Sequence, residues 1–214
     1  MRAWSYLLSQ VSGIPATLAN SLGIAIIVAA AAVLISMPAA RVLALNEFRG
    51  KRAVMFLLIL PILSPSFAVA TGSHALFLKY GLTDSLFGVI CSHLIPAIPY
   101  CVLLLTGSFS RLDTDLEAQA QSLGASPMNV FRYVTFPAIA PGLAVAAAFG
   151  FLISWSQYLT TLFVGGGKIQ TLPLVLVSFQ RSGDDAVTAA LTLIFIAPAI
   201  IVFVVVAKFL RNAN

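Results

Sequence analysis

Long apolar runs alternate with short polar intervals along this chain of 214 residues. A helix needs about 20 mostly apolar residues to cross a membrane, and about five runs reach that length. The expected spans are approximately residues 21–43, 54–73, 86–106, 139–160 and 187–209. The pattern therefore predicts an all-α, polytopic helical membrane protein with about five transmembrane helices. We expect residues 1–214 to form one transmembrane domain with its core at 18–209.

The second of these runs contains Pro61 and Pro65 together with Ser64 and Ser66. Proline removes a backbone hydrogen bond and clashes with the preceding turn, so this helix is expected to be kinked or broken. Two interpretations stay open. Neighbouring helices absorb the kink, or the segment exposes its carbonyl groups beside a transport path.

Residues 1–17 are too short and too polar to span a membrane. Four of these residues suit a short helix that lies at the membrane interface, namely Trp4, Tyr6, Leu7 and Leu8. The apolar run that follows is longer than the hydrophobic region of a usual signal peptide, and no clean A-x-A cleavage site follows it. We interpret it as a permanent first span.

The polar interval at 112–143 is the longest one that still shows helical order. Thr114 and Glu117 have the spacing of a capping box, in which the third helical residue bonds back to the cap. Gly124 suits a left-handed C-terminal cap, and Ser126, followed by a proline, restarts a helix. A helix-turn-helix between two membrane spans indicates a docking site for another protein.

Only 9% of the residues are charged, against about 25% in soluble domains. The net charge of +5 is spread over many loops, which does not suggest a nucleic-acid-binding patch. Basic residues cluster after the first span, and the positive-inside rule then places the N-terminus outside and the C-terminus in the cytoplasm. The basic residues expected inside are Arg41, Arg49, Lys51, Arg52, Arg111, Arg132, Lys208 and Arg211, and those expected outside are Arg2, Lys79, Lys168 and Arg181.

The chain shows no catalytic grouping, no metal site and no cofactor motif. The three glycines before Lys168 lack the spacing of a phosphate-binding loop. His74 and His93 are far apart without further ligands beside them. Cys91 and Cys101 would lie about 15 Å apart on one helix, too far for a disulfide. The chain is therefore not expected to be an enzyme or to hydrolyse ATP by itself.

Polar residues inside two of the expected spans are candidates for the lining of a translocation path. His93 is ionisable and lies well inside an apolar run, so it is either a neutral imidazole bonded to another helix or a group facing a pore. Helical spacing predicts that Ser154 and Tyr158 share one face, with Gln157 adjoining. Such groups also commonly tie membrane helices together, and both interpretations stay open.

The interval at 112–143 resembles the EAA loop of the membrane subunits of ABC importers. The likeness rests on Ala118-Gln119-Ala120, Gly124 and Phe136-Pro137. The glutamate of the family pattern would fall on Ala118, whereas this chain has Glu117 one position earlier. Similarity extends from about residue 17 to 209 and includes Leu60-Pro61, S-W-S-Q-Y-L-T-T-L-F-V-G-G-G and Q-T-L-P. The chain thus resembles a permease subunit of a type I, binding-protein-dependent ABC importer.

This resemblance implies a bacterial cytoplasmic (inner) membrane location, contact with membrane lipid and a set of partners. They are a second permease subunit, two ATP-binding subunits that hold ATP and magnesium, and a periplasmic or lipid-anchored substrate-binding protein. The polyamine, iron, thiamine and phosphonate permeases look most similar, and the molybdate and sulfate permeases stay open. The coupling residues implied by the likeness and the chemistry of the loop are Leu116, Glu117, Ala118, Ala120, Gly124, Ala125, Met128, Phe131 and Pro137.

Two rival interpretations belong to other classes. An ATP-independent secondary transporter or channel subunit predicts paired charges within the spans or inverted repeats, and neither is evident. A structural membrane anchor explains a docking loop but not the proline-rich spans with their polar bands.

Overall fold

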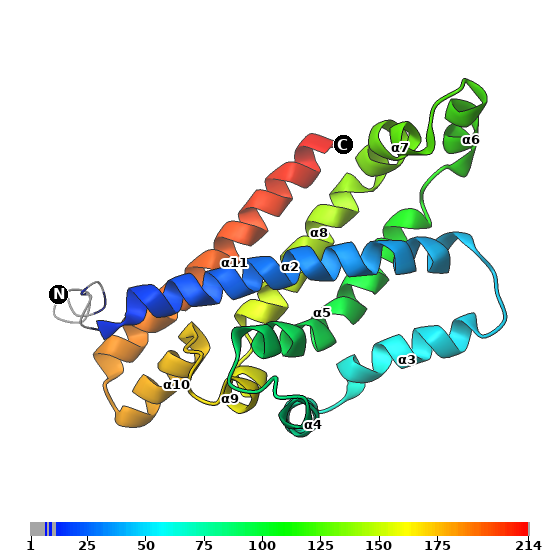
Figure 1. The fold of residues 1–214 in the computed structure, drawn as a ribbon. Coiled ribbons are helices and arrows are strands. Elements are labelled where there is room, and N and C mark those ends of the chain that lie inside the picture. Colours follow the sequence, from blue (N-terminus) through cyan, green and yellow to red (C-terminus); the bar gives the residue numbers. More distant parts are fainter. Residues whose placement is uncertain (1–6, 8, 10–11, 214) are drawn as a thin grey trace.

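The computed structural model describes residues 7, 9 and 12–213, and the regular elements of that part are all helices (Figure 1). Four helices are long and apolar enough to cross a membrane, and a bent pair supplies a fifth span if its two helices count as one. The four are α2 (Ile14–Leu45), α5 (Leu86–Phe109), a continuous helix over Pro127–Trp155, and α11 (Asp185–Ala213). The predicted all-α membrane fold is confirmed.

The bent pair consists of α3 (Lys51–Leu63) and α4 (Ser66–Lys79), which meet at an angle of 101°. Ser64 caps the end of α3, and Pro65 precedes α4. Because proline disfavours the helical conformation in the residue before it, the chain leaves α3 at Ser64. The second expected span is therefore a broken helix.

The core of the bundle forms where α2 crosses α5 and α8 (Phe136–Trp155), and small side chains let these helices approach closely. A methyl group on Gly150 would lie 3.2 Å from the Ala29 Cα atom. The Ser36 hydroxyl donates to the Ile98 carbonyl at 3.3 Å, which links α2 to α5. Close packing of small residues with a few interhelical hydrogen bonds is the usual basis of helix association in membranes.

The fourth expected span differs from the prediction at both ends. The helix begins at Pro127, passes through α7 (Pro127–Val130) and a π-helical turn, η2 (Phe131–Thr135), and ends at Trp155. In the π turn the Phe136 amide bonds to the Phe131 carbonyl, five residues back, so the helix continues through Pro137. The residues expected to continue it to 160 instead form a break and then α9 (Leu159–Gly165).

This break separates two residues predicted to share a helical face. Ser154 lies in the last turn of α8, whereas Tyr158 is the N-cap of α9. The indole of Trp155 donates to the Phe195 carbonyl at 2.9 Å and stacks on the Phe195 ring, which fixes the end of α8 against α11. The prediction that Ser154 and Tyr158 share one helical face is therefore wrong, because α8 ends between them, where Trp155 is held against α11.

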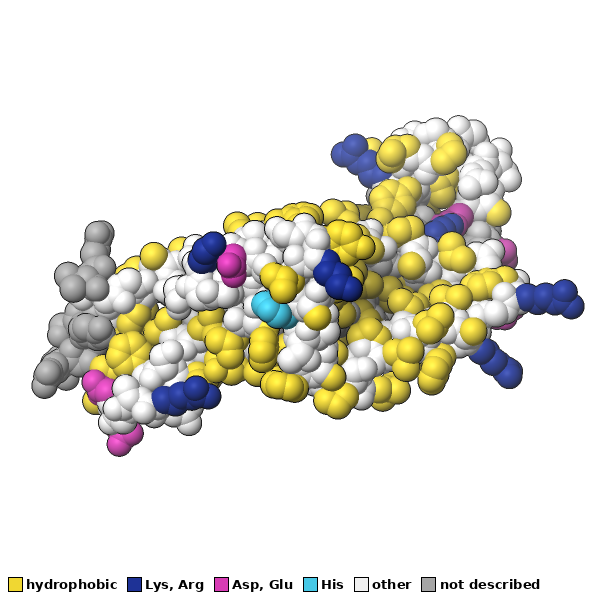
Figure 2. All heavy atoms as spheres, turned by 60° about the horizontal axis from the view of Figure 1, so that its bottom comes forward, with side chains coloured by type: hydrophobic (Ala, Val, Ile, Leu, Met, Phe, Trp, Pro, Cys, Tyr) yellow, Lys and Arg dark blue, Asp and Glu magenta, His cyan; other side chains and the backbone are white. Residues whose placement is uncertain are grey.

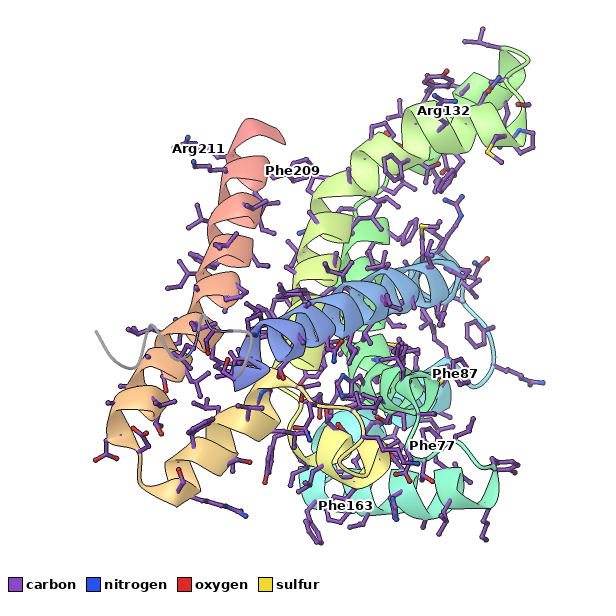
Figure 3. The ribbon with its side chains drawn as sticks, turned by 60° about the vertical axis from the view of Figure 1, so that its left-hand side comes forward. Phe77, Phe87, Arg132, Phe163, Phe209 and Arg211 are labelled. Carbon is purple, nitrogen blue, oxygen red and sulfur yellow. The ribbon has the colours of Figure 1, made fainter. Side chains whose placement is uncertain are left out.

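The long helices leave the molecule with two distinct ends. Figure 1 shows α6 (Thr114–Ser122), α7 and the C-terminus toward one end, which we call the α6 end, and α9 and α10 (Leu172–Ser182) toward the other, the α9 end. Figure 3 shows Arg132 and Arg211 at the α6 end, and Phe77 and Phe163 at the opposite end. Figure 2 shows hydrophobic side chains over most of the face that carries α4 and α9.

Most of the residues predicted to form an interfacial helix lie outside the part of the chain that the structure describes. Trp4, Tyr6 and Leu8 lie outside the described residues. Leu7 is described, and it is buried in the same apolar cluster as Ile14 and Trp155.

Candidate functional site: an exposed helix pair and a cavity between two helix breaks

The first candidate site is α6. The N-cap of this helix lies one residue earlier than the sequence predicted. Asp113 is the N-cap, and its carboxylate accepts a hydrogen bond from the Asp115 amide at 3.0 Å. Thr114 is the first helical residue. The predicted capping box of Thr114 and Glu117 is wrong, because Asp113 takes the cap position and the Glu117 carboxylate bonds elsewhere.

The turn after α6 matches the expectation closely. Gly124 has a φ of 89°, a left-handed conformation that glycine adopts without a steric penalty. The Ala125 amide donates to the Ala120 carbonyl at 3.0 Å, and the Gly124 amide donates to the Gln121 carbonyl at 2.9 Å. These two bonds form a Schellman motif, which satisfies the last carbonyls of the helix. The predicted left-handed cap at Gly124 is confirmed.

The next helix also begins as predicted. The Ser126 hydroxyl accepts a hydrogen bond from the Asn129 amide at 3.4 Å, and Pro127 occupies the first turn. The helix-turn-helix is therefore a capped, ordered unit that projects from the end of the bundle, as Figure 1 shows.

Glu117 anchors this unit to the rest of the molecule. Its carboxylate receives two hydrogen bonds from the Arg41 guanidinium, at 2.9 and 2.6 Å, and a third from the Thr135 hydroxyl. The Arg41 guanidinium also lies 5.8 Å from the centre of the Phe109 ring. One carboxylate thus joins α6 to the end of α2 and to the π turn. We call Arg41, Glu117 and Thr135 the α6 clamp.

The electrostatics of the α6 clamp favour an ionised carboxylate. The hydrogen bonds from Arg41 are the largest influence and lower the Glu117 pKa, and the bond from Thr135 acts in the same direction. Burial opposes them, since the Glu117 side chain is only 9% exposed. The Arg41 side chain is 40% exposed, so water screens part of the pair. The paired geometry is the strong, bidentate form of an arginine–carboxylate contact.

The outer surface of the helix pair carries apolar side chains that the described part of the chain leaves exposed. Leu123 is 89% exposed and Met128 is 71% exposed. A shallow depression on α6 is lined by Asp115, Ala118, Gln119, Ser122 and Leu123. Exposed apolar groups rimmed by polar ones are typical of a protein interaction surface.

The predicted coupling residues divide into three groups by exposure. Leu116, Ala118, Gly124, Met128 and Pro137 are exposed, Ala120, Ala125 and Phe131 are half-buried, and Glu117 is buried. The sequence prediction did not include the exposed Leu123 and Tyr133, nor the clamp partners Arg41 and Thr135. Leu123 had a detectable signal, since it is an apolar residue beside the capping glycine. The clamp partners had none, because they lie far from Glu117 in the sequence.

Among the four residues predicted to line a path, His93 and Ser154 are bonded to each other. The His93 Nδ1 atom lies 2.9 Å from the Ser154 Oγ atom, and its Nε2 atom lies 2.9 Å from the Thr161 Oγ1 atom. His93 is 1% exposed. The imidazole therefore joins α5 to α8 and α9, which is the geometry of a helix-tying residue.

A second candidate site is a cavity of about 230 Å³ between the α3–α4 break and the α8–α9 break. Gln157 lines it, whereas His93, Ser154 and Tyr158 do not. The lining residues are Pro61, Ile62, Ser64, Ser66, Val69, Pro96, Tyr100, Ile153, Ser156, Gln157 and Thr160. Their role in transport, like that of the predicted path residues, stays a prediction.

Comparison with known proteins assigns the chain to a family. Residues 32–213 match the family described as binding-protein-dependent transport system inner membrane component. The chain belongs to this family. Its members are the membrane components of binding-protein-dependent transport systems, and the chain is accordingly an ABC importer permease subunit and a multi-pass membrane protein. This family assignment disfavours the two rival interpretations, an ATP-independent transporter or channel subunit and a structural membrane anchor.

Individual relatives agree with this assignment. The chain is 33% identical over 193 residues to the trehalose transport system permease protein SugB of Mycobacterium tuberculosis, which covers 88% of this chain and 70% of that protein. It is 25% identical over 201 residues to the spermidine/putrescine transport system permease protein PotC of Escherichia coli, which covers 94% and 76%. A chain of the inward-facing MetNI methionine ABC transporter has a similar fold, with a TM-score of 0.74, 15% identity, and coverage of 92% and 94%.

Proposed function

We propose that this permease forms the translocation path of an ABC importer and that the helix pair of α6 and α7 receives a separate ATPase subunit. ATP and magnesium would reside on two such partner chains. The observation that carries the proposal is the α6 clamp, in which Glu117 bonds to Arg41 and Thr135. An exposed helix tied this firmly to two long helices can transmit a rigid-body displacement.

The direction of transmission follows from the covalent and hydrogen-bonded connections of α6. A push on α6 acts on α2 through Arg41 and on α8 through Thr135 and the π turn. Because α2 and α8 also pack against one another at Gly150, the two helices would move as one body. ATP-driven closure of the partner subunits would thereby switch the path between inward-open and outward-open states.

The remaining partners complete a path that one chain cannot enclose. No residue of α3 is buried within this chain, and its apolar side chains include the exposed Phe56, Leu57 and Leu63. We infer that a second permease subunit, identical or related, packs against this side. A periplasmic or lipid-anchored binding protein would deliver the solute at the α9 end, with the α6 end facing the cytoplasm of a bacterial inner membrane.

The docking proposal is tested by substituting Gly124. A tagged chain is purified from its host membrane, and the ATPase activity that copurifies is measured. Gly124→Trp places a bulky ring on the docking surface, where the space around Gly124 is open, so we expect at least a tenfold loss of copurifying ATPase. Gly124→Asn is the matched control, because asparagine tolerates the left-handed conformation and adds little bulk.

A second variant separates surface contact from backbone strain. Leu123→Asp changes an exposed side chain with ordinary backbone geometry and should also reduce the copurifying ATPase, with the amount of folded chain unchanged. If Gly124→Trp and Leu123→Asp both retain the ATPase and solute uptake, the docking proposal is refuted.

A further inference from the structure

We propose that the cavity between the two helix breaks is a binding site for an uncharged solute rich in hydroxyl groups, such as a saccharide or polyol. The proposal rests on the proposed function, because it names the class of solute that this permease would carry. It uses the cavity lining alone and does not depend on how the ATPase docks.

The cavity lies where two helices are interrupted. α3 ends at Ser64 after about 20 Å of helix, and α8 ends at Ser156. Each helix end leaves carbonyl groups without intrahelical partners. Within a membrane such backbone is tolerated only where protein buries it or where it lines a polar cavity. Two breaks that face one cavity therefore mark a place built for a polar guest.

The side chains around the cavity offer both donors and acceptors. In the described part of the chain, the hydroxyls of Ser66 and Tyr100 and the Nε2 group of Gln157 have no hydrogen-bond partner. The hydroxyls of Ser64 and Ser156 donate to their own helices, at 2.8 and 3.1 Å, and keep their lone pairs free. A hydroxyl group on a solute can donate and accept at once, so it matches this mixture.

The same lining is a poor match for a charged solute. None of the eleven lining residues is acidic or basic. An ammonium group would find no carboxylate here, and an oxyanion would find no arginine or lysine. An ion without a partner in a low-dielectric site keeps its full desolvation penalty. A hydroxylated neutral molecule avoids this penalty and still satisfies the polar groups.

The wall of the cavity is held by a buried hydrogen-bond network. His93 hydrogen-bonds to Ser154 in α8 and to Thr161 in α9, so it bridges the α8–α9 break. The Thr161 hydroxyl also donates to the Gln157 carbonyl at 3.0 Å. The Thr160 hydroxyl donates to the Gln157 side-chain oxygen at 2.8 Å. These bonds fix the orientation of Gln157 before a solute arrives, and preorganised polar groups bind with a smaller loss of conformational entropy.

The test measures protection of a cysteine in the cavity. Ser156→Cys is introduced into the full chain with Cys91→Ala, while Cys101 stays because it is buried. The purified chain is treated with methyl methanethiosulfonate in the presence of glucose, sucrose, spermidine or sulfate. We expect glucose or sucrose to slow the modification at least threefold in a saturable manner, and spermidine and sulfate to leave it unchanged.

Two further variants make the result specific. Leu123→Cys lies on α6, away from the cavity, and none of the four solutes should protect it. Adding Gln157→Leu to the Ser156→Cys chain removes the oriented amide and should abolish protection while copurification of the ATPase is kept. Protection by spermidine or sulfate, or no protection by either sugar, overturns the proposal. Loss of the ATPase from the unaltered chain would instead refute the docking proposal.

Discussion

At Glu117 a single carboxylate controls how three helical segments meet. It accepts two hydrogen bonds from Arg41 and one from Thr135, so removing either partner takes hydrogen bonds from a buried carboxylate. Hydrogen bonds to charged groups contribute about 1.5–3 kcal/mol, and the 40% exposure of Arg41 places this pair toward the lower end of that range.

Replacing this carboxylate should loosen α6 locally. Glu117→Gln keeps the size of the side chain but loses the charge, so α6 should detach more easily, by about 1.5 kcal/mol. Hydrogen exchange of the α6 amides is then expected to accelerate roughly tenfold. Glu47→Gln is the control, since Glu47 forms only an exposed ion pair with Lys51 at 2.7 Å and its loss should change little. Equal exchange rates in the two variants would contradict the anchoring role of Glu117.

The same carboxylate should make the stability of the folded chain depend on pH. Its pKa is lowered from an ordinary value of 4.5 by the hydrogen bonds from Arg41, so the ionised form stabilises the folded chain. That stabilisation is fully present above the ordinary pKa and is lost as the pH falls through the lowered pKa. The midpoint of thermal unfolding should therefore be higher for the natural chain than for Glu117→Gln at pH 7. The difference should vanish in strong acid, and a difference that persists there would exclude this origin.

At the scale of helices, the close crossing of α2 and α8 depends on the absence of a side chain at Gly150. A methyl group added there would lie 3.2 Å from the Ala29 Cα atom, which belongs to the backbone and cannot rotate away. The helices must separate to admit anything larger. The prolines of this chain, by contrast, interrupt its helices less often than their number suggests. At Pro137, for example, the π turn lets the helix continue.

Two glycines provide a matched test of this crossing. Gly150→Val should destabilise the bundle by about 1–3 kcal/mol through overpacking. Gly23 lies in α2 with no atom near the position of an added methyl group, so Gly23→Val should stay within about 0.5 kcal/mol of the natural chain. The measurement is thermal unfolding of each purified chain in the same detergent. A Gly150 variant as stable as the Gly23 variant would show that the crossing is not tightly packed.

At the scale of the whole molecule, the distribution of basic residues predicts an orientation in the membrane. Figure 3 shows Arg132 and Arg211 both toward the α6 end, on different sides of the molecule, although they are far apart in sequence. The positive-inside rule predicts that this end faces the cytoplasm. The docking surface would then face the compartment that supplies ATP.

Cysteine labelling in intact cells checks this orientation. In a chain with Cys91→Ala, a membrane-impermeant maleimide should label Lys168→Cys, at the α9 end, from outside. The same reagent should label Leu123→Cys, which is 89% exposed in this chain, only after the cells are opened and the ATPase subunits are stripped from the membrane. Labelling of Leu123→Cys in intact cells would reverse the orientation and remove the ATPase proposal with it.

The sequence by itself determined the features that depend on neighbouring residues. The presence of about five apolar spans, the left-handed cap at Gly124, the helix start at Ser126 and the interruption at Ser64 follow from local hydrophobicity and backbone preference. Only the tertiary structure decided the partners of Glu117, the π turn and the cavity around Gln157. Arg41 is 76 residues from Glu117, and the cavity is lined from five helices and the breaks between them. Contacts over such separations depend on how helices pack, and local patterns carry no record of that packing.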